Sequence, residues 1–277
     1  MTCWRDLLRQ GQDYLGSDDA TREISIFIRH QTGSAYVDWN EDVTDAQIDG
    51  FQDFLRERQN GRPLSKILGR REFWKDEFVV TDHVLDPRPD SELLVEQACK
   101  LPDVQRILEL GVGSGAVLLS VLREMPKDNG VGVDNSPQAI EITHKNAERL
   151  GLLSRVQLIE SDWFSNVEGT FDLIICNPPY LSAAEYEARP IELNWDPQSA
   201  LSDNDDGLSV YRLIARTVGN FLMPRGVLLL EIGWTQAQAV TTIFSEQGFD
   251  NFQVFKDING KDRVLKIFQI CSEIHSE

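Results

Sequence analysis

Short apolar runs alternate with helix-like stretches from Arg106 onward, and this alternation constrains the fold more than any other feature of the 277-residue chain. The runs are rich in β-branched residues and bounded by turn residues, which is typical of buried strands. Strands that alternate with helices predict a parallel sheet with helical crossovers, and therefore an α/β fold. The predicted strands are Arg106–Leu110, Val131–Val133, Val156–Ile159, Leu173–Cys176, Val227–Ile232, Phe252–Phe255 and Val264–Ile270, and the predicted helices are Ala116–Glu124, Pro137–Leu150, Ser209–Phe221 and Thr235–Gln247.

The first sixty or so residues have a different pattern. Apolar residues recur there at helical spacing in three segments, Leu7–Leu15, Ile24–Ile28 and Ile48–Leu55, and Thr44 can cap the third. Two apolar runs on either side of Lys75–Glu77 then predict a short β-hairpin. We expect three parts: a helical domain at 1–70, a hairpin and linker at 71–90, and the sheet domain at 91–277. The helical part shows no chemistry of its own, so its default role is structural, and binding of a partner is the alternative.

Charge and composition argue against several classes of protein. The 27 Lys and Arg residues against 45 Asp and Glu give a net charge of −18, which disfavours binding to nucleic acid phosphates. No apolar stretch reaches membrane-spanning length, and charged residues interrupt Arg5–Arg9, where an export signal needs an apolar core. We expect a cytoplasmic monomer with no membrane or direct nucleic acid partner. The 4 Cys and 4 His residues are scattered, so neither a metal site nor a Cys/His nucleophile is predicted.

A glycine-rich turn follows the first predicted strand and reads Glu109-Leu110-Gly111-Val112-Gly113-Ser114-Gly115. Glycines at alternate positions let the backbone turn tightly and approach a ligand closely. The second strand ends in Asp134, whose carboxylate can accept both hydroxyls of a ribose. Because the turn lacks the spacing that seats a pyrophosphate, a nucleoside without phosphates fits better, such as S-adenosylmethionine.

The third predicted strand ends at Asp162 and Trp163. A carboxylate and an indole at this edge can receive the amino group and the face of an adenine. A loop cap and a core filler are the alternative interpretations of these two residues. Since three consecutive strand ends carry suitable groups, the sequence favours a nucleoside site.

The fourth predicted strand ends at Asn177-Pro178-Pro179-Tyr180. The prolines lack backbone N–H groups and fix φ, so the chain leaves the sheet at its carboxyl edge, where open α/β sheets bind ligands. The corner offers the Asn177 carboxamide, the Pro178 carbonyl and the Tyr180 ring, a set that suits a planar NH2 group. A stiff loop without chemistry is the alternative for these four residues alone.

Prolines flank Arg88 in the segment Pro87-Arg88-Pro89-Asp90-Ser91-Glu92 and hold its backbone extended. Asp90 or Ser91 can cap a helix that begins near Glu92. The segment is either a linker with an N-cap or a wall of an active site. In the second case Arg88 is a candidate substrate-binding residue.

Taken in order, these motifs resemble those of class I methyltransferases that act on an amino or amide nitrogen. The helical domain, the hairpin and the Pro87–Glu92 segment are similar to those of the peptide chain release factor glutamine methyltransferases, and the resemblance covers essentially the whole chain. The chain departs from the family pattern at Asp86, which is usually apolar, at Asp196, which is usually Glu, and in the acidic loop from Leu201 to Gly207. Further matches lie at Trp195-Asp196-Pro197, Ala200-Leu201, Asp257, Gly260, Asp262 and Arg263.

The resemblance implies a Rossmann-like, seven-stranded class I methyltransferase sheet with S-adenosylmethionine as cofactor. It implies methyl transfer to the glutamine side chain of the Gly-Gly-Gln motif of a class 1 peptide chain release factor, in support of translation termination. The Asn177 side-chain oxygen and the Pro178 carbonyl would bind the two amide hydrogens, and the helical domain would hold the release factor. The implied catalytic residues are Asn177, Pro178, Pro179 and Tyr180, which bind substrate together with Arg88. The implied cofactor-binding residues are Glu109, Gly111, Val112, Gly113, Ser114, Gly115, Asp134, Asp162, Trp163 and Asn177.

Three alternatives remain open. An N6-adenine DNA methyltransferase would use the same corner, but the charge of −18 argues against it. A nucleotide-dependent oxidoreductase would use Asp134 in the same way and has no use for Asn177–Tyr180. A non-catalytic binding module derived from the fold would bind the cofactor without turnover.

Overall fold

The computed structural model describes residues 2–268, which divide into two compact units. The helical unit comprises residues 2–70 together with Pro190–Trp195. The sheet unit comprises Arg71–Arg189 and residues 196–268. No helix among these described residues is long and apolar enough to cross a membrane.

The helical unit is built on the three predicted helices. A capping box starts the third, because the Thr44 hydroxyl accepts from Gln47 N while the Gln47 side chain accepts from Thr44 N. Aromatic residues fill the core, with the Phe27 and Phe54 rings stacked 4.3 Å apart. The helices are α1 (Trp4–Leu15), α2 (Ala20–Thr32), α3 (Asp45–Gln59) and the short α4 (Leu64–Leu68).

Pro190–Trp195 belongs to the helical unit although it is distant in sequence. It contains the 3-10 turn η3 (Ile191–Trp195). The Arg62 guanidinium lies 4.6 Å from the centre of the Trp195 ring, and Gly61 leaves room for Ile191, whose Cγ2 would lie 2.8 Å from an added Cβ. The helical unit is therefore made of two separate pieces of chain.

The predicted hairpin is present as β1 (Arg70–Phe73) and β2 (Asp76–Val79). Its turn contains Trp74 in the left-handed region, and Trp74 N donates to Glu92 Oε1 at 2.8 Å. Phe73 and Phe78 are buried in the core of the sheet unit. The hairpin is thus packed against the helix that begins at Glu92.

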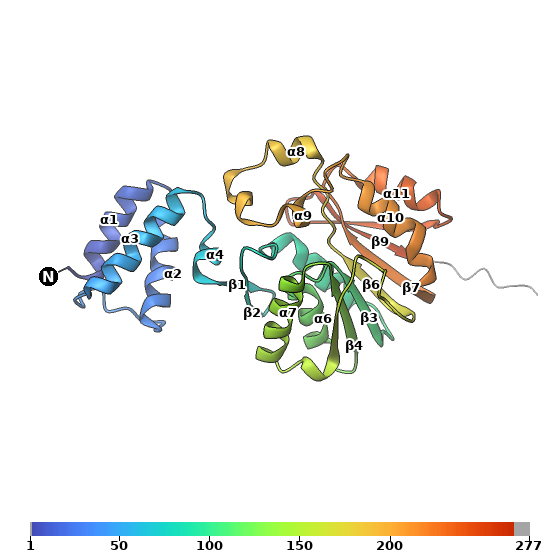
Figure 1. Cartoon of the computed structure of the whole chain (residues 1–277), viewed down its shortest axis with the longest axis horizontal. Helices are drawn as coiled ribbons and strands as arrows, with labels where there is room; N and C mark the ends of the chain where they lie inside the picture. Colours follow the sequence, from blue (N-terminus) through green and yellow to red (C-terminus); the bar gives the residue numbers. More distant parts are fainter. Residues whose placement is uncertain (1, 269–277) are drawn as a thin grey trace, which may run out of the picture. The chain divides into compact units, whose positions relative to one another are not determined.

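The sheet unit contains a seven-stranded sheet of order β5-β4-β3-β6-β7-β9-β8, which confirms the predicted α/β class. β3 to β7 pair in parallel, and the ribbon in Figure 1 runs from green at β3 and β4 through yellow at β6 to orange at β7. β9 runs antiparallel to both of its neighbours, β7 and β8, because the β8–β9 connection Asp257–Lys261 is too short for a crossover. The strands are β3 (Arg106–Leu110), β4 (Asn129–Asp134), β5 (Val156–Glu160), β6 (Phe171–Cys176), β7 (Leu222–Glu231), β8 (Asn251–Lys256) and β9 (Asp262–Phe268). The last two predicted residues of β9 lie outside the described part of the chain.

Helices cover both faces of the sheet. Leu173, Ile175 and Leu229 pack with α5, α6 and α7 on one face, and Ile174, Cys176 and Leu230 pack with α10 and α11 on the other. Side chains of one strand alternate between these two cores, as the pleat requires. The helices are α5 (Glu92–Cys99), α6 (Ala116–Glu124), α7 (Pro137–Arg149), α8 (Ala183–Glu187), α9 (Gln198–Leu201), α10 (Ser209–Thr217) and α11 (Ala237–Ser245), with 3-10 turns η1 (Pro89–Ser91), η2 (Leu153–Arg155) and η4 (Val218–Asn220).

The strand order reverses between β3 and β6, so the carboxyl ends of these strands form a topological switch point. Glu109, Asp134 and Asn177 come at or next to the ends of β3, β4 and β6. The registers pair Leu110 with Val133 and with Cys176, which sets these three side chains at one edge of the sheet. This edge is where a ligand site is expected.

Candidate active site

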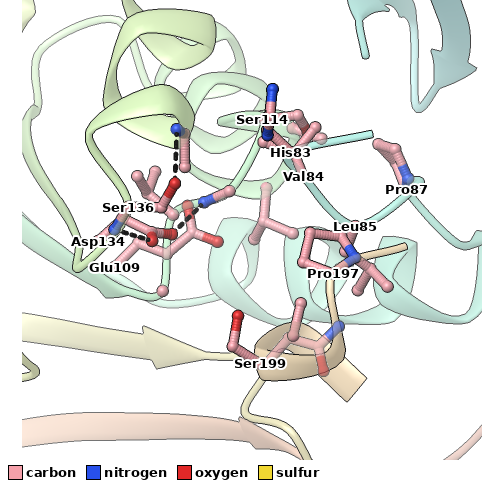
Figure 2. A pocket seen from close by; sticks show the side chains of 18 of the residues that line it. His83, Val84, Leu85, Pro87, Glu109, Ser114, Asp134, Ser136, Pro197 and Ser199 are labelled. Atoms are coloured by element: carbon pink, nitrogen blue, oxygen red, sulfur yellow. Dashed lines mark hydrogen bonds between the residues drawn. The ribbon is translucent and has the colours of Figure 1, made fainter. Parts of the chain in front are cut away.

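A cavity lies at the switch point and is lined by loops from the strand ends of the sheet unit (Figure 2). The residues that line it include most of the predicted cofactor site and part of the predicted substrate site. From the predicted set these are Arg88, Glu109, Gly111, Val112, Gly113, Ser114, Asp134, Trp163, Asn177 and Pro179. Gly115, Asp162, Pro178 and Tyr180 were also predicted and do not line the cavity.

The glycine-rich turn has the geometry that its sequence predicts. Gly111 and Gly113 have φ of 69° and 55°, which favours glycine, and a Cβ at Gly111 would meet nothing within 4 Å. The space beside Gly111 is therefore open to a ligand. Gly115 differs, because a Cβ there would lie 2.7 Å from Thr143 Cγ2 and 2.9 Å from Leu119 Cδ1. Glycine at position 115 therefore allows α6 and α7 to pack closely against this turn.

Asp134 is held by the turn that it faces. Its Oδ2 accepts from Gly113 N at 3.0 Å and its Oδ1 accepts from Ser136 N at 3.0 Å (Figure 2). Burial raises the pKa of Asp134, while these backbone hydrogen bonds oppose the shift. Each carboxylate oxygen keeps a further lone pair, so the group can accept hydroxyl hydrogens of a ligand.

Glu109 lies on the same face of the sheet as Asp134, and its side chain is buried. Burial raises its pKa well above the ordinary range, a hydrogen bond from Leu118 N to Oε2 opposes the shift, and the charge of Asp134 adds to it. Glu109 therefore holds its proton more readily than an exposed glutamate. A neutral carboxyl can donate one hydrogen bond as well as accept others.

Successive side chains after the end of β5 point alternately toward the cavity and toward solvent. Ser161 and Trp163 line the cavity, whereas Asp162 between them is exposed. Ser161 Oγ donates to Trp163 O at 2.9 Å and accepts from Asn166 N at 3.0 Å, which holds Trp163 at a φ of 49°. Trp163 is placed to cover a planar ligand, and the adenine-binding role of Asp162 stays a prediction.

Asn177 lines the cavity directly after β6, together with Pro179. Its Nδ2 donates to Ser91 Oγ at 3.2 Å, and Ser91 Oγ donates to Glu231 Oε2 at 2.6 Å. We expected Ser91 to be able to cap the helix that begins at Glu92, and its hydroxyl makes no such bond. The hydroxyl binds Glu231 instead. The buried pair of Ser91 and Glu231 thus fixes one side of the Asn177 carboxamide, and the sequence analysis did not predict this pair.

Tyr180 packs against the apolar core beside α10 and α11 rather than lining the cavity. Its carbonyl accepts from Gln236 Nε2 at 2.9 Å, and a Cβ at Gly207 would lie only 2.5 Å from the same oxygen. Burial raises the pKa of its phenol, so the group keeps its proton. Pro178 is also buried. The corner formed by Asn177–Tyr180 is therefore held rigidly at its carboxyl end.

Arg88 lines the cavity and pairs with both single residues that depart from the family pattern, Asp86 and Asp196. Its Nη2 lies 2.6 Å from Asp196 Oδ2, while Asp196 Oδ1 accepts from Asp86 N at 2.9 Å. Asp86 is buried, with Arg71 Nη1 3.7 Å and Arg88 Nη1 4.0 Å from its Oδ2. The two acids and two arginines join the segment around Pro87 to the segment around Pro197, both of which line the cavity.

The acidic loop from Leu201 to Gly207 uses its carboxylates locally. Asp203 accepts from the backbone N–H groups of Asp205, Gly207 and Ser209, and from the Ser209 hydroxyl. Leu181 N donates to Leu201 O at 3.0 Å, which ties the loop to the chain after Tyr180. The acidity of this loop therefore serves turn formation and the start of α10.

Other cavity-lining residues were not singled out by sequence reasoning. They come from the loop after β2, from the start of α7 and from the α9 segment, and apolar or small side chains dominate. They include Asp82, His83, Val84, Ser136 and Ser199. Only their position in the fold identifies them, since loops of this composition are common.

Comparisons with known proteins point to methyltransferases. A family model described as the methyltransferase small domain matches residues 71–192. The chain is 37% identical to a release factor glutamine methyltransferase of Agrobacterium fabrum, over 90% of this chain and 91% of that protein. It is 36% identical to a bifunctional methyltransferase of Rickettsia conorii over 91% of this chain and 54% of that protein, so it spans about half the length of that relative. A solved methyltransferase structure from Pyrococcus furiosus shares the fold, with a TM-score of 0.55, 16% identity, and coverage of 79% of this chain and 99% of that one.

Proposed function

The chain belongs to the family of release factor glutamine methyltransferases, and from this membership we propose that it methylates the side-chain amide nitrogen of the glutamine in the Gly-Gly-Gln motif of a class 1 peptide chain release factor. It is an S-adenosylmethionine-dependent methyltransferase. One observation carries the assignment of the site: Asn177 and the glycine-rich turn line the same cavity. A nucleoside bound at the turn and an amide bound at Asn177 would therefore meet.

The residues at the turn fit S-adenosylmethionine. The open space beside Gly111 admits a ligand close to the backbone, and Asp134 is oriented to accept two ribose hydroxyls. Trp163 supplies an aromatic surface for a base. When bound, the cofactor supplies a methyl group on a positively charged sulfur. The chain itself holds this group against the strand ends and positions the acceptor beside it.

The acceptor amide is a weak nucleophile because its lone pair is delocalised into the carbonyl. We expect the Asn177 side-chain oxygen and the Pro178 carbonyl to accept its two hydrogens, as fixed dipoles that oppose this delocalisation. Both groups sit on a proline-locked corner, so little reorganisation is needed when the amide binds. Positioning of this kind can supply at most about 7–11 kcal/mol of the barrier reduction.

The helical unit is the proposed binding region for the release factor. It has its own aromatic core and contributes no residue to the described cavity, so its surface is available for another task. We propose that the enzyme acts as a monomer, because the sheet unit by itself supplies the residues assigned to cofactor and acceptor binding. A net charge of −18 argues against a nucleic acid substrate. Cytoplasmic location follows from the substrate, since release factors work at ribosomes.

The test is methyl transfer to a purified release factor. The chain is incubated with radiolabelled S-adenosylmethionine and either the intact release factor, a release factor whose Gly-Gly-Gln glutamine is replaced by alanine, or duplex DNA. We expect label in the intact release factor alone, recovered as N5-methylglutamine after digestion. Label in DNA would support the adenine methyltransferase alternative, and cofactor binding without any label would support a non-catalytic module.

A further inference from the structure

The sheet register places a buried glutamate beside Asn177. Cys176 on β6 pairs with Leu230 on β7, so the next residues, Asn177 and Glu231, lie on neighbouring strands and on the same face. This is the face that α5 covers, and Ser91 immediately precedes α5. Ser91 Oγ lies 2.6 Å from Glu231 Oε2 and 3.2 Å from Asn177 Nδ2. The three side chains form a short hydrogen-bonded chain that ends at the cavity.

Counting donors fixes the direction of this chain. A carboxylate only accepts hydrogen bonds, so an ionised Glu231 takes the single hydrogen of the Ser91 hydroxyl. The oxygen of Ser91 then has only lone pairs to offer to Asn177. Asn177 must present its NH2 group to Ser91, and its carbonyl oxygen turns the other way. That oxygen is the acceptor which the amide hydrogens of the substrate require.

We propose that Ser91 and Glu231 are positioning residues that orient the Asn177 carboxamide for the acceptor amide. This inference rests on the proposed function and specifies how its central residue is set. With a neutral Glu231 the order is lost, because the carboxyl can donate to Ser91 and free the Ser91 hydrogen for the Asn177 carbonyl. The carboxamide can then turn over and offer NH2 where the substrate needs an acceptor. The enzyme therefore requires an ionised Glu231.

The surroundings of Glu231 set the pH at which its carboxyl group ionises. Burial raises the pKa of Glu231 to about 7, and the hydrogen bonds from Ser91 and Asn177 and the charge of Arg263 oppose the shift. Asp90 adds to the rise, and Arg263 Nη2 lies 3.3 Å from Asp90 Oδ2. The titratable or charged groups that interact electrostatically with Glu231 are Asp90 from η1, Cys176 and Tyr180 from the β6 corner, Tyr211 from α10 and Arg263 from β9. Burial raises the pKa values of Cys176 and of both tyrosines, so these three stay neutral near pH 7.

The first variant removes the Ser91 hydroxyl that connects Glu231 to Asn177 and leaves the contact between Asn177 and Glu231 itself in place. Ser91→Ala is expected to lower kcat roughly 10- to 100-fold, as for other losses of positioning. Its affinity for S-adenosylhomocysteine should stay within twofold of wild type, because Ser91 acts on the acceptor side. Ser120→Ala is the matched control, since Ser120 is equally buried and its hydroxyl has no hydrogen-bond partner among the described residues. A Ser91→Ala enzyme with wild-type kcat would overturn the proposal.

The second variant tests the charge. At saturating cofactor and release factor, the wild-type kcat should fall as the pH drops below about 7, with the ionisation of Glu231. Glu231→Gln should have a lowered kcat at pH 8 and a profile without this fall. The pKa values of Glu109 and Asp134 are also raised, but these two residues lie where the cofactor is expected to bind. Saturating cofactor therefore separates their ionisation from that of Glu231. The same acidic fall in Glu231→Gln would exclude Glu231 as its source.

A spectroscopic readout makes the test independent of turnover. In protein labelled with 15N-asparagine, the Asn177 side-chain NH2 signals, assigned by their loss in Asn177→Ala, should shift with the same midpoint near pH 7. Signals that do not titrate would contradict the proposed coupling. If the wild-type chain methylates no release factor, the proposed function fails. If it does so and Ser91→Ala matches it, only the positioning role fails.

Discussion

Replacing the buried Glu231 by glutamine should stabilise the fold above neutral pH. Glu231 is 1% exposed at the end of a central strand. Its pKa is raised from 4.5 to about 7 in the folded chain, and burial is the main cause. Between these two values the folded state holds a proton that the unfolded state has lost. The free energy of unfolding therefore falls as the pH rises through this window.

The size of the effect follows from the difference in pKa. About 2.5 pKa units at 1.36 kcal/mol each give a cost of about 3 kcal/mol, complete above pH 7 and absent below pH 4.5. Glu231→Gln keeps the shape and cannot ionise, so it should gain up to this amount at pH 8 and little at pH 5. For a unit of about 200 residues this gain corresponds to roughly 6–12 °C in Tm.

The assay is urea or thermal unfolding of wild type and Glu231→Gln at pH 5 and pH 8, followed by tryptophan fluorescence and circular dichroism. Glu168→Gln serves as the control, because Glu168 is exposed. Glu109 and Asp134 contribute to the pH dependence of both proteins, so their effects cancel in the difference. A variant that is no more stable than wild type at pH 8 would refute the reasoning. Combined with a lower kcat, the expected gain would mean that this acid is kept for function at the expense of stability.

Three further predictions concern the corner and the cofactor site. Asn177→Ala should lower kcat by at least about 100-fold and leave the fold intact, as judged by circular dichroism; normal turnover would remove Asn177 from the mechanism. Asp134→Ala should weaken S-adenosylhomocysteine binding roughly 10- to 100-fold in calorimetric titration, and an unchanged affinity would place the ribose elsewhere. Gly207→Ala should destabilise the chain by about 2 kcal/mol or more, since φ is 79° and the added Cβ would lie 2.5 Å from Tyr180 O. Gly219→Ala, with nothing within 4 Å of its added Cβ, is the matched control for thermal unfolding.

Sequence reasoning located strands well where both faces are buried. β3 was predicted at Arg106–Leu110 and has these bounds, because its apolar residues Ile107, Leu108 and Leu110 are buried and the glycine-rich turn ends it. β7 begins at Leu222, five residues before its predicted start. Pro224-Arg225-Gly226 has the composition of a turn, and Arg225 has a φ of 70°, so the irregular start of this strand could not be recognised from composition.

The cofactor side of the site was more predictable than the acceptor side. A glycine turn followed by an acidic strand end has few other uses, and both parts line the cavity. Ser91 was assigned only as a candidate cap, which is the commonest use of serine before a helix. Its bond to Glu231 links residues 140 positions apart and depends on the order of strands in the sheet. Such a contact needs the fold, because no local pattern encodes it.

The two-piece helical unit has a consequence for chimaeric enzymes. An exchange of residues 1–70 between relatives, meant to redirect the choice of protein substrate, would leave Pro190–Trp195 behind from the recipient. The incoming helices would then pack against the recipient's Ile191 and Trp195, which are matched to the recipient's own Gly61 and Arg62 and not to the residues of the donor. Grafts that carry both pieces together should fold better than grafts of the first piece alone, so the minimal transplantable module is discontinuous in the gene.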